Sequence, residues 1–233
     1  MRTRLKVCCI ASIEEARLAI RLGADALGLV GRMPSGPGPI DDDLIAEIAR
    51  AVEPPIATFL LTSRTEPDDV VSHVLAAGVN TVQLVDAVPD ATHAALRRHA
   101  PSVRIVQVLH VCDELVLEDA RRLEPAVDAF LLDSGRPTAA IKELGGTGRT
   151  HDWQISARLV ASIERPVFLA GGIRSENVAD AIRTVRPFGI DLCSGVRTGG
   201  RLDETRLRSL VSEIRAADAS LGSFQSTPKS DLP

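Results

Sequence analysis

Short apolar runs alternate with amphipathic segments along most of this chain, and the pattern occurs eight times. Each run is nearly continuously hydrophobic, which is typical of strands buried on both faces of a parallel sheet. Each following segment has apolar residues at helical spacing. The predicted strands are 5–10, 26–30, 56–61, 81–85, 103–109, 127–132, 167–170 and 190–193. The predicted helices are 13–24, 41–52, 67–77, 90–99, 113–123, 152–163, 175–185 and 203–216.

Eight strand-helix units within 233 residues favour a closed barrel. An open doubly wound sheet more often has about five or six strands. We therefore predict a single α/β domain, a (β/α)8 TIM barrel over residues 1–217. Residues 218–233 are rich in Ser, Asp and Pro, which predicts a flexible C-terminal tail.

Charge and composition exclude several classes of function. The net charge is −4 and the basic residues are scattered among the acidic ones, which argues against a polyanion-binding groove. Aromatic residues are only 3% of the chain, too few for stacking on single-stranded nucleic acid. No apolar stretch has the roughly 18 residues needed to span a bilayer. We expect a soluble, cytoplasmic protein that binds neither nucleic acid nor a membrane.

Cysteine and histidine positions do not predict a metal site. The four cysteines have neither CxxC spacing nor a nearby histidine cluster, so neither zinc nor a disulfide framework is indicated. The five histidines also lack ligand spacing, and we expect each to lie at the surface or at a helix cap. These are residues His73, His93, His99, His110 and His151.

In a barrel of this kind, chemistry takes place at the carboxyl ends of the strands. Three predicted strand ends are followed by small residues: GGTG at 145–148, AGG at 170–172 and SG at 194–195. Glycine lets a phosphate approach backbone N–H groups closely, although tight turns also use glycine. Three such segments on neighbouring strands favour a phosphate site. The residues assigned to it are Gly146, Thr147, Gly148, Gly171, Gly172, Ser194 and Gly195.

Two other strand ends carry side chains that could transfer protons. Asp133 follows the sixth strand, where a carboxyl group could act as a general acid or simply accept hydrogen bonds from loop amides. Cys8 lies at the end of the first strand. It is either a small buried hydrophobic residue or a thiolate base, and the latter needs a nearby positive charge or helix N-terminus. Consecutive strand residues face opposite sides, so we expect only one of Cys8 and Cys9 to face the barrel interior.

Several segments resemble the phosphoribosylanthranilate isomerase family of the tryptophan pathway. The opening KVCCIASIEEARLAIRLGADALGLV is similar to the family segment that begins KICGIT. FLLDS, GGTGRTHDW and PVFLAGGIRSENVADAIRTVRPFGIDLCSGV are similar to the family's sixth to eighth strands and their loops. The similarity covers residues 4 to about 216. It implies a TIM barrel that binds a small phosphorylated substrate and uses no metal or cofactor.

The resemblance also implies a reaction and roles for residues. The reaction is the Amadori rearrangement of N-(5-phosphoribosyl)anthranilate to its 1-deoxyribulose isomer. Asp133 corresponds to the general acid that protonates the furanose ring oxygen, and Cys8 to the base that removes the C2 proton. The glycine segments correspond to the phosphate site.

Three departures from the family pattern bear on the substrate. Cys9 stands where the family has glycine, and Val85 and Asp86 stand where it has His-Gly. SGPGP at 35–39 replaces an arginine-bearing motif associated with the anthranilate carboxylate, and Arg32 in the same loop is our candidate substitute. These departures leave open a divergent paralogue that acts on another phosphorylated sugar or carbonyl compound. A non-catalytic barrel is a third, less favoured reading, and the sequence does not predict an oligomeric state.

Overall fold

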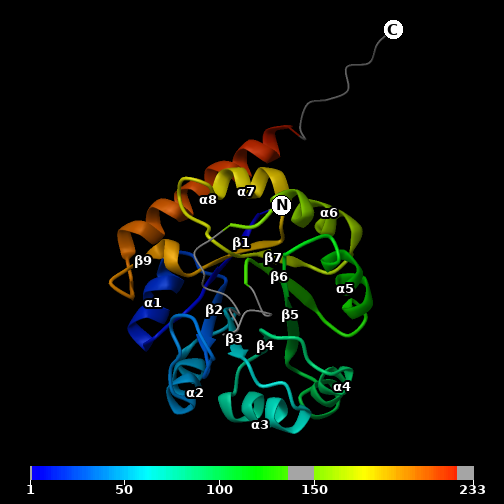
Figure 1. Ribbon diagram of the computed structural model, residues 1–233. Coiled ribbons are helices and arrows are strands. Elements are labelled where there is room, and N and C mark those ends of the chain that lie inside the picture. The colour runs from blue at the N-terminus through cyan, green and yellow to red at the C-terminus, as the bar shows by residue number, and fades with distance from the viewer. Residues whose placement is uncertain (1, 136–149, 225–233) are drawn as a thin grey trace.

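Eight parallel strands form a closed barrel surrounded by helices in this computed structural model, which describes residues 2–135 and 150–224 (Figure 1). Each strand pairs with the next along the chain, and β8 pairs with β1. The strands are β1 Arg4–Val7, β2 Ala26–Val30, β3 Ala57–Thr62, β4 Thr81–Leu84, β5 Arg104–His110, β6 Ala129–Asp133, β7 Val167–Leu169 and β8 Gly189–Leu192. The predicted TIM barrel is therefore confirmed.

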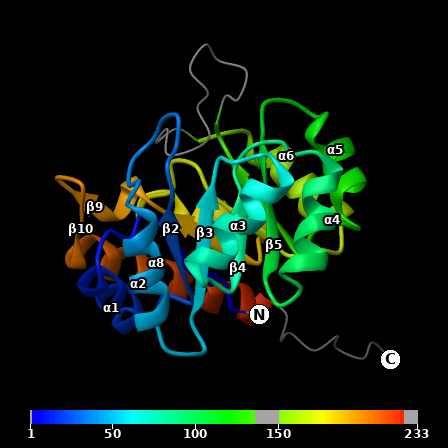
Figure 2. The ribbon, with the colours of Figure 1, turned by 90° about the horizontal axis from the view of Figure 1, so that it is seen from below.

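The helices lie outside the barrel, as Figure 2 also shows. They are α1 Ile13–Arg21, α2 Asp42–Ala51, α3 Pro67–Ala77, α4 Asp90–His99, α5 Val116–Leu123, α6 Trp153–Ser162, α7 Val178–Val185 and α8 Glu204–Phe224. A short 3-10 helix, η1 Ser194–Val196, and a two-stranded sheet of β9 Arg197–Thr198 and β10 Arg201–Leu202 follow β8.

Local sequence signals explain where several helices begin and end. The Ser12 side chain accepts a hydrogen bond from the Glu15 amide and caps α1. Helix α3 begins at Pro67, which lacks the amide hydrogen that would go unpaired there. It ends before Gly78, whose φ of 63° is readily adopted by glycine. The bounds of β2, α3 and α4 coincide with the predicted ones.

Side chains alternate between two apolar layers along each strand. Leu27, Leu29 and Leu60 pack outward against the helices, in the larger core. Ala26, Val30 and their neighbours on the other face fill the barrel interior. Phe168 packs edge to face against Phe59 and Phe188, with ring centroids 5.9 and 5.3 Å away. The interior is thus a packed core, and the space for chemistry lies at its carboxyl end.

Helix α8 extends beyond the end predicted for the barrel. It continues to Phe224 and packs against α7. Asp218 accepts hydrogen bonds from the amide and the hydroxyl of Thr3, at 2.8 and 2.6 Å, and so joins α8 to the start of β1. The predicted boundary at residue 217 therefore falls inside a helix. Sequence composition missed this because Ser and Asp are compatible with a helix whose other face is packed.

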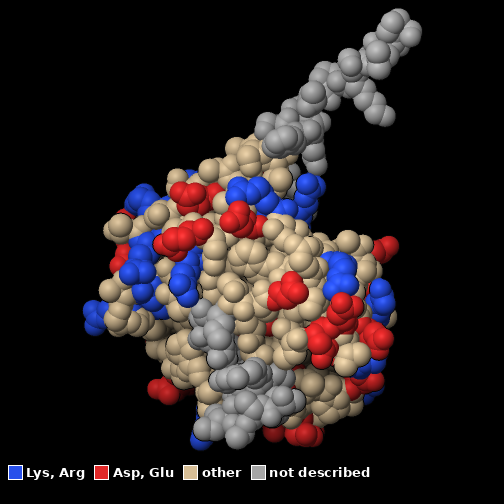
Figure 3. Space-filling view, turned by 45° about the horizontal axis from the view of Figure 1, so that its top comes forward, with Lys and Arg blue, Asp and Glu red and all other residues tan. Residues whose placement is uncertain are grey.

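The charges on the surface are mixed in sign. On the face drawn in Figure 3, acidic and basic side chains are interspersed over the helices. Within the described parts of the chain, no helix is both long and apolar enough to cross a membrane.

Candidate active site

A cavity opens at the carboxyl end of the barrel, where the sequence predicts the chemistry. Its lining comes from the ends of several strands and from the loop after β2. Cys8, Asp133, Gly171, Gly172 and Ser194, all predicted site residues, line it together. The cavity also includes Asp191, Cys9 and Cys193, which the sequence analysis did not assign to the site.

Asp133 is the last residue of β6 and is buried at the cavity wall. Burial raises the pKa of its carboxyl group, although the Ser134 amide, His110 and Lys6 act in the opposite direction. The Ser134 amide donates to Oδ1 at 2.7 Å. A carboxyl group with a raised pKa holds its proton closer to neutral pH, as a general acid must. The same group also accepts a loop amide, so its environment is compatible with both of the roles that the sequence left open.

Cys8 follows the last residue of β1 and lies against the cavity. A hydrogen bond from Cys9 lowers the pKa of the Cys8 thiol, burial opposes this, and the Lys6 ammonium lowers it further. A lowered pKa increases the thiolate fraction, which is the form that can accept a proton.

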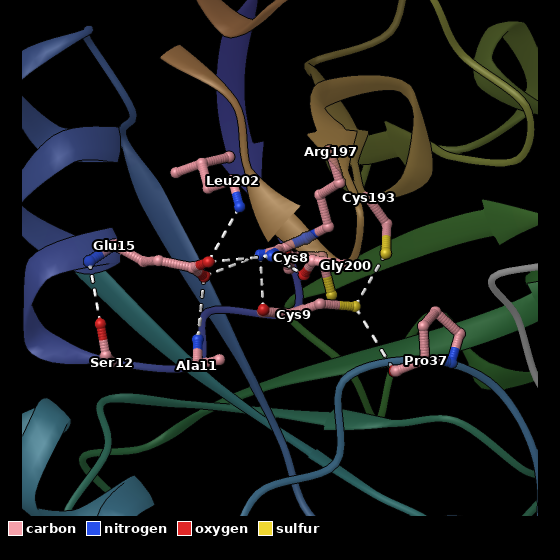
Figure 4. A network of polar contacts seen from close by, with 10 residues as sticks. All are labelled: Cys8, Cys9, Ala11, Ser12, Glu15, Pro37, Cys193, Arg197, Gly200 and Leu202. Carbon is pink, nitrogen blue, oxygen red and sulfur yellow. Dashed lines mark hydrogen bonds and ion pairs between the residues drawn. The ribbon is translucent and has the colours of Figure 1, made fainter.

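Cys9 also lines the cavity, so the expectation that only one of the two thiols could face it is wrong. Strand β1 ends at Val7, and Cys9 has a φ of 62°, so strand alternation no longer applies to it. This left-handed conformation favours glycine, the residue that the family pattern has here. The Cys9 sulfur lies 2.8 Å from the Cys193 sulfur and 3.5 Å from the Pro37 carbonyl oxygen (Figure 4).

A buried ion pair lies beside these groups. Lys6 is fully buried, and its Nζ lies 2.8 Å from Oδ1 of Asp191, its register partner on β8. Burial opposes the charge on Lys6, but the Asp191 carboxylate raises the pKa of the lysine overall. Nζ also lies 5.2 Å from the ring centroid of Phe59. The sequence did contain a signal, because Lys6 and Asp191 each stand between two apolar residues of a strand and Lys6 alternates onto the side of Cys8.

Gly28 on β2 leaves space for this arrangement. A Cβ atom at Gly28 would lie 2.7 Å from the Cys8 sulfur and 3.1 Å from the Lys6 Nζ. Both atoms therefore meet at the point where any other residue would place its side chain. The sequence analysis did not single out Gly28.

The predicted phosphate residues are brought together in part. Gly171 and Gly172 have φ of 84° and 63°, and they line the cavity with Ser194 at the start of η1. Gly195 does not line the cavity, but a Cβ there would lie 2.2 Å from the Ile173 carbonyl oxygen, so it permits close packing of the two loops. Gly146, Thr147 and Gly148 lie outside the described residues.

Arg32 has an exposed side chain and is not among the residues that line the cavity. Met33 and Ser35 from the same loop do line it, and so does Val85 after β4. Asp86, the other departure after β4, is buried, and its side chain accepts the Ala87 amide.

The expected surface positions of two histidines are wrong. His73 is buried between Thr62 and Asp42, at 3.1 and 3.0 Å, and His93 is buried 3.3 Å from Gln107. Both lie on helix faces that pack against the barrel, where His73 uses both ring nitrogens in hydrogen bonds and His93 uses Nε2. No group of three potential metal ligands occurs within residues 2–135 and 150–224.

A polar network holds the chain at Cys8 and Cys9 (Figure 4). The Arg197 guanidinium donates to the carbonyl oxygens of both cysteines and to the Glu15 carboxylate. Glu15 also accepts the amides of Ala11 and Leu202, at 3.1 and 2.8 Å. The network therefore joins the end of β1 to α1 and to the segment after β8. Its residues come from two distant parts of the sequence, 8–15 and 197–202, and the sequence pattern did not reveal it.

Comparisons with known proteins agree with this geometry. The family model for N-(5'-phosphoribosyl)anthranilate isomerase matches residues 5–213. An isomerase of that name from Methanosarcina mazei is 38% identical over 89% of this chain and 92% of its own length. One from Haloferax volcanii is 36% identical over 92% and 94%.

Solved structures give the same result. The phosphoribosyl anthranilate isomerase of Thermotoga maritima has a TM-score of 0.77 and 27% identity, covering 92% of this chain and 99% of the other. A structure of a phosphoribosyl anthranilate isomerase in complex with reduced 1-(o-carboxyphenylamino)-1-deoxyribulose 5-phosphate has a TM-score of 0.74 and 25% identity, with the same coverage. The match of the family model over nearly the whole chain and the identities above 30% show that this chain belongs to the N-(5'-phosphoribosyl)anthranilate isomerase family.

Proposed function

We propose that Cys8 and Asp133 transfer the protons in the isomerisation of N-(5-phosphoribosyl)anthranilate to 1-(2-carboxyphenylamino)-1-deoxyribulose 5-phosphate. Membership of the family makes this protein an isomerase of tryptophan biosynthesis. The observation that carries the two roles is one cavity lined by a thiol whose pKa is lowered and a carboxyl group whose pKa is raised. Opposed shifts of this kind distinguish a base from an acid.

The chemistry begins with opening of the sugar ring. Asp133 gives its proton to the furanose ring oxygen, the bond from C1 to that oxygen breaks, and the nitrogen lone pair forms a protonated Schiff base at C1. The Cys8 thiolate then takes the proton from C2. The electrons of that C–H bond form a C1–C2 double bond, and the C–N π electrons return to nitrogen. The resulting enolamine tautomerises to the ketose, so no redox partner is needed.

The loops after β7 and β8 are proposed to hold the substrate phosphate. Gly171 and Gly172 leave the backbone accessible, and Ser194 adds a hydroxyl group at the same wall of the cavity. Anchoring the phosphate would fix C1 and C2 between Cys8 and Asp133, which is the main benefit of binding a remote group.

A charge substitution tests the phosphate site. Gly172→Asp and Gly172→Asn have nearly the same size, and both residue types tolerate the left-handed conformation at this position. We expect KM for the Asp variant to exceed that for the Asn variant at least about tenfold, equivalent to ~1.4 kcal/mol. Equal KM values in two folded variants would place the phosphate elsewhere.

Arg32 is proposed to bind the substrate carboxylate when substrate is present. It belongs to the loop that contributes Met33 and Ser35 to the cavity, and its exposed side chain has room to move. Arg32→Ala should weaken binding of the reduced product analogue at least about tenfold, since losing a charge-assisted pair in a desolvated site costs roughly 2 kcal/mol or more. Binding of inorganic phosphate should be unchanged. Unaltered affinity for the analogue would remove Arg32 from the site.

Complementation tests the function itself. A tryptophan auxotroph that lacks this isomerase should grow without tryptophan when it expresses the wild-type protein, but not when it expresses folded Cys8→Ser or Asp133→Asn variants. Growth requires the complete reaction and not binding alone. If the wild-type protein accumulates in folded form and growth still fails, the divergent paralogue becomes the better account. Cytoplasmic location stays a prediction from the sequence.

A further inference from the structure

We propose that Lys6, held by Asp191 beneath the cavity, is the cation that keeps Cys8 in its thiolate form and so sets the pH range of the reaction. Lys6 is a positioning residue in this account, because it acts through Cys8 and not on the substrate. The inference rests on the proposed role of Cys8 as the base. It adds a charge pair that the mechanism above does not use.

The position of Lys6 carries the argument. Its side chain is fully buried, two residues before Cys8 on the same face of β1. The Lys6 Nζ and the Cys8 sulfur lie 3.1 and 2.7 Å from the point where a Gly28 Cβ would be, so they are close neighbours. A cation this near an anionic sulfur, and removed from water, is weakly screened.

The hydrogen bonding of Lys6 leaves part of its ammonium group available to other groups at the cavity. Within residues 2–135 and 150–224, Asp191 is the only hydrogen-bond partner of Nζ, so two of the three N–H groups are not taken by that pair. The Phe59 ring stabilises the ammonium without neutralising it. The ammonium can therefore interact with a group besides Asp191 and Phe59, and the Cys8 sulfur is adjacent to it.

The choice of lysine at this position is unusual for this chain. Only three of its 27 basic residues are lysines, and one of them, Lys6, lies in strand β1. A guanidinium is broad and planar, whereas an ammonium is a compact point charge. The narrow space beside Gly28 fits the compact group.

The other charged and titratable groups around Cys8 act with known signs. The Asp191 carboxylate raises the pKa of Cys8, which opposes Lys6, and Cys9 lowers it by a hydrogen bond. Cys193 lies next to Cys9, at 2.8 Å between sulfurs. On the acid side, Lys6 lowers the pKa of Asp133, and His110 does the same. Loss of Lys6 should therefore raise the pKa of both the base and the acid.

Three variants separate a charge effect from a structural one. Lys6→Met removes the cation, Asp191→Asn removes the anion, and Lys6→Met/Asp191→Asn removes both, so that no unpaired buried charge is left to impair folding. Arg208→Gln is the control, because Arg208 is exposed on α8 and pairs with Glu204 there. The rate of Cys8 alkylation by iodoacetamide, located by tandem mass spectrometry and measured against pH, reports the thiolate fraction without any substrate.

We expect the midpoint of Cys8 alkylation in the double variant to lie above that in Asp191→Asn, because the two differ only in the Lys6 cation. In Lys6→Met the midpoint should rise above the wild-type value by at least about one pH unit. At a pH below both midpoints, that is about a tenfold loss of thiolate. The alkylation midpoint should fall in Asp191→Asn and stay at the wild-type value in Arg208→Gln. The pH profile of kcat/KM, where turnover is measurable, should move upward in Lys6→Met on both its acid and its alkaline limbs.

A folded Lys6→Met variant with the wild-type alkylation midpoint would overturn the proposal, because the ammonium would then not act on Cys8. If Lys6→Met does not fold, a double variant with the same midpoint as Asp191→Asn would overturn it equally, because those two differ only in the Lys6 cation. If the midpoints shift as expected but Cys8→Ser retains full turnover, the charge effect stands and the assignment of Cys8 as base fails. The two failures are therefore distinguishable.

Discussion

Single residues at and beside the end of β1 determine how closely the Cys8 sulfur and the Lys6 ammonium can approach each other. Gly28 has no side chain at the place where the Cys8 sulfur and the Lys6 ammonium meet. Cys9 adopts a backbone conformation that glycine prefers, and its thiol hydrogen-bonds to Cys8. Activity should consequently be more sensitive to small changes here than the burial of the residues alone suggests.

Gly28→Ala should lower kcat at least about tenfold. The new Cβ would lie only 2.7 Å from the Cys8 sulfur and would push it away, and the rate falls steeply when a reacting group is misplaced. Gly189→Ala is the matched control. Its Cβ would lie 2.8 Å from the Phe168 ring at the opposite end of the barrel. Gly189→Ala should lose stability but keep kcat. Steady-state kinetics and urea unfolding of both variants distinguish the two effects, and equal kcat values would contradict this assignment.

The sequence predicted the site at this scale only where a residue stands at a strand end. Asp133 and Cys8 could be found because a barrel places strand ends at one rim. Lys6 and Asp191 were missed because they lie within strands and acquire their role through pairing of β1 with β8. The same rule placed Gly171 and Gly172 at the cavity, whereas the exposed position of Arg32 depends on the path of its loop.

At the scale of elements, contacts between distant segments hold the barrel rim. Arg197 after η1 joins Glu15 on α1 to the backbone of Cys8 and Cys9. The order of strands and helices follows from the apolar pattern, since a buried strand and an amphipathic helix have different periods. The ends of elements follow less well, because capping and tertiary contacts decide them. Helix α8 is an example, since it packs against α7 and continues to Phe224.

Arg197→Gln should lower the free energy of unfolding by about 3 kcal/mol, because it leaves Glu15 buried without its cation. The side chains of Arg197 and Glu15 are only 7% and 15% exposed. Arg208→Gln removes an exposed pair on α8 and should change it by no more than about 0.5 kcal/mol. Urea unfolding followed by circular dichroism measures both free energies of unfolding. Similar losses in the two variants would show that the Arg197–Glu15 pair stabilises the protein no more than an exposed ion pair does.

Asp218→Ala should destabilise the protein by about 2 kcal/mol, because its carboxylate accepts two hydrogen bonds from Thr3. Ser220→Ala, two residues further along α8, removes only a hydroxyl that donates to the Ala217 carbonyl and should cost less. The thermal unfolding temperatures of the two variants and the wild-type protein measure the difference. If Asp218→Ala unfolds at the wild-type temperature, residue 217 would be an adequate boundary for the barrel after all.

At the scale of the whole molecule, buried histidines link stability to pH. Burial lowers the pKa of His73, His93 and His151, the last to about 4. The unfolded chain binds the proton of such a histidine more tightly than the folded protein does. Each contribution to stability is therefore complete above the ordinary pKa of about 6.5 and declines as the pH falls below it.

The free energy of unfolding should consequently fall between about pH 6.5 and pH 4, and His151 should account for about 2 kcal/mol of the change. His151→Asn should flatten this part of the profile, although it also loses the 2.7 Å contact with Ser156 and is less stable at neutral pH. A slope that His151→Asn does not alter would mean that His151 is not titrating in this range.

Cys8 and Asp133 are proposed to be the base and the acid of the isomerisation. The most direct test is the single-turnover rate on N-(5-phosphoribosyl)anthranilate for the wild-type protein, Cys8→Ser and Asp133→Asn, with folding verified by circular dichroism. We predict that each variant is slower by roughly 10²-fold to 10⁴-fold, the usual contribution of a general acid or base. A folded variant that turns over at the wild-type rate would contradict the role of the residue it lacks.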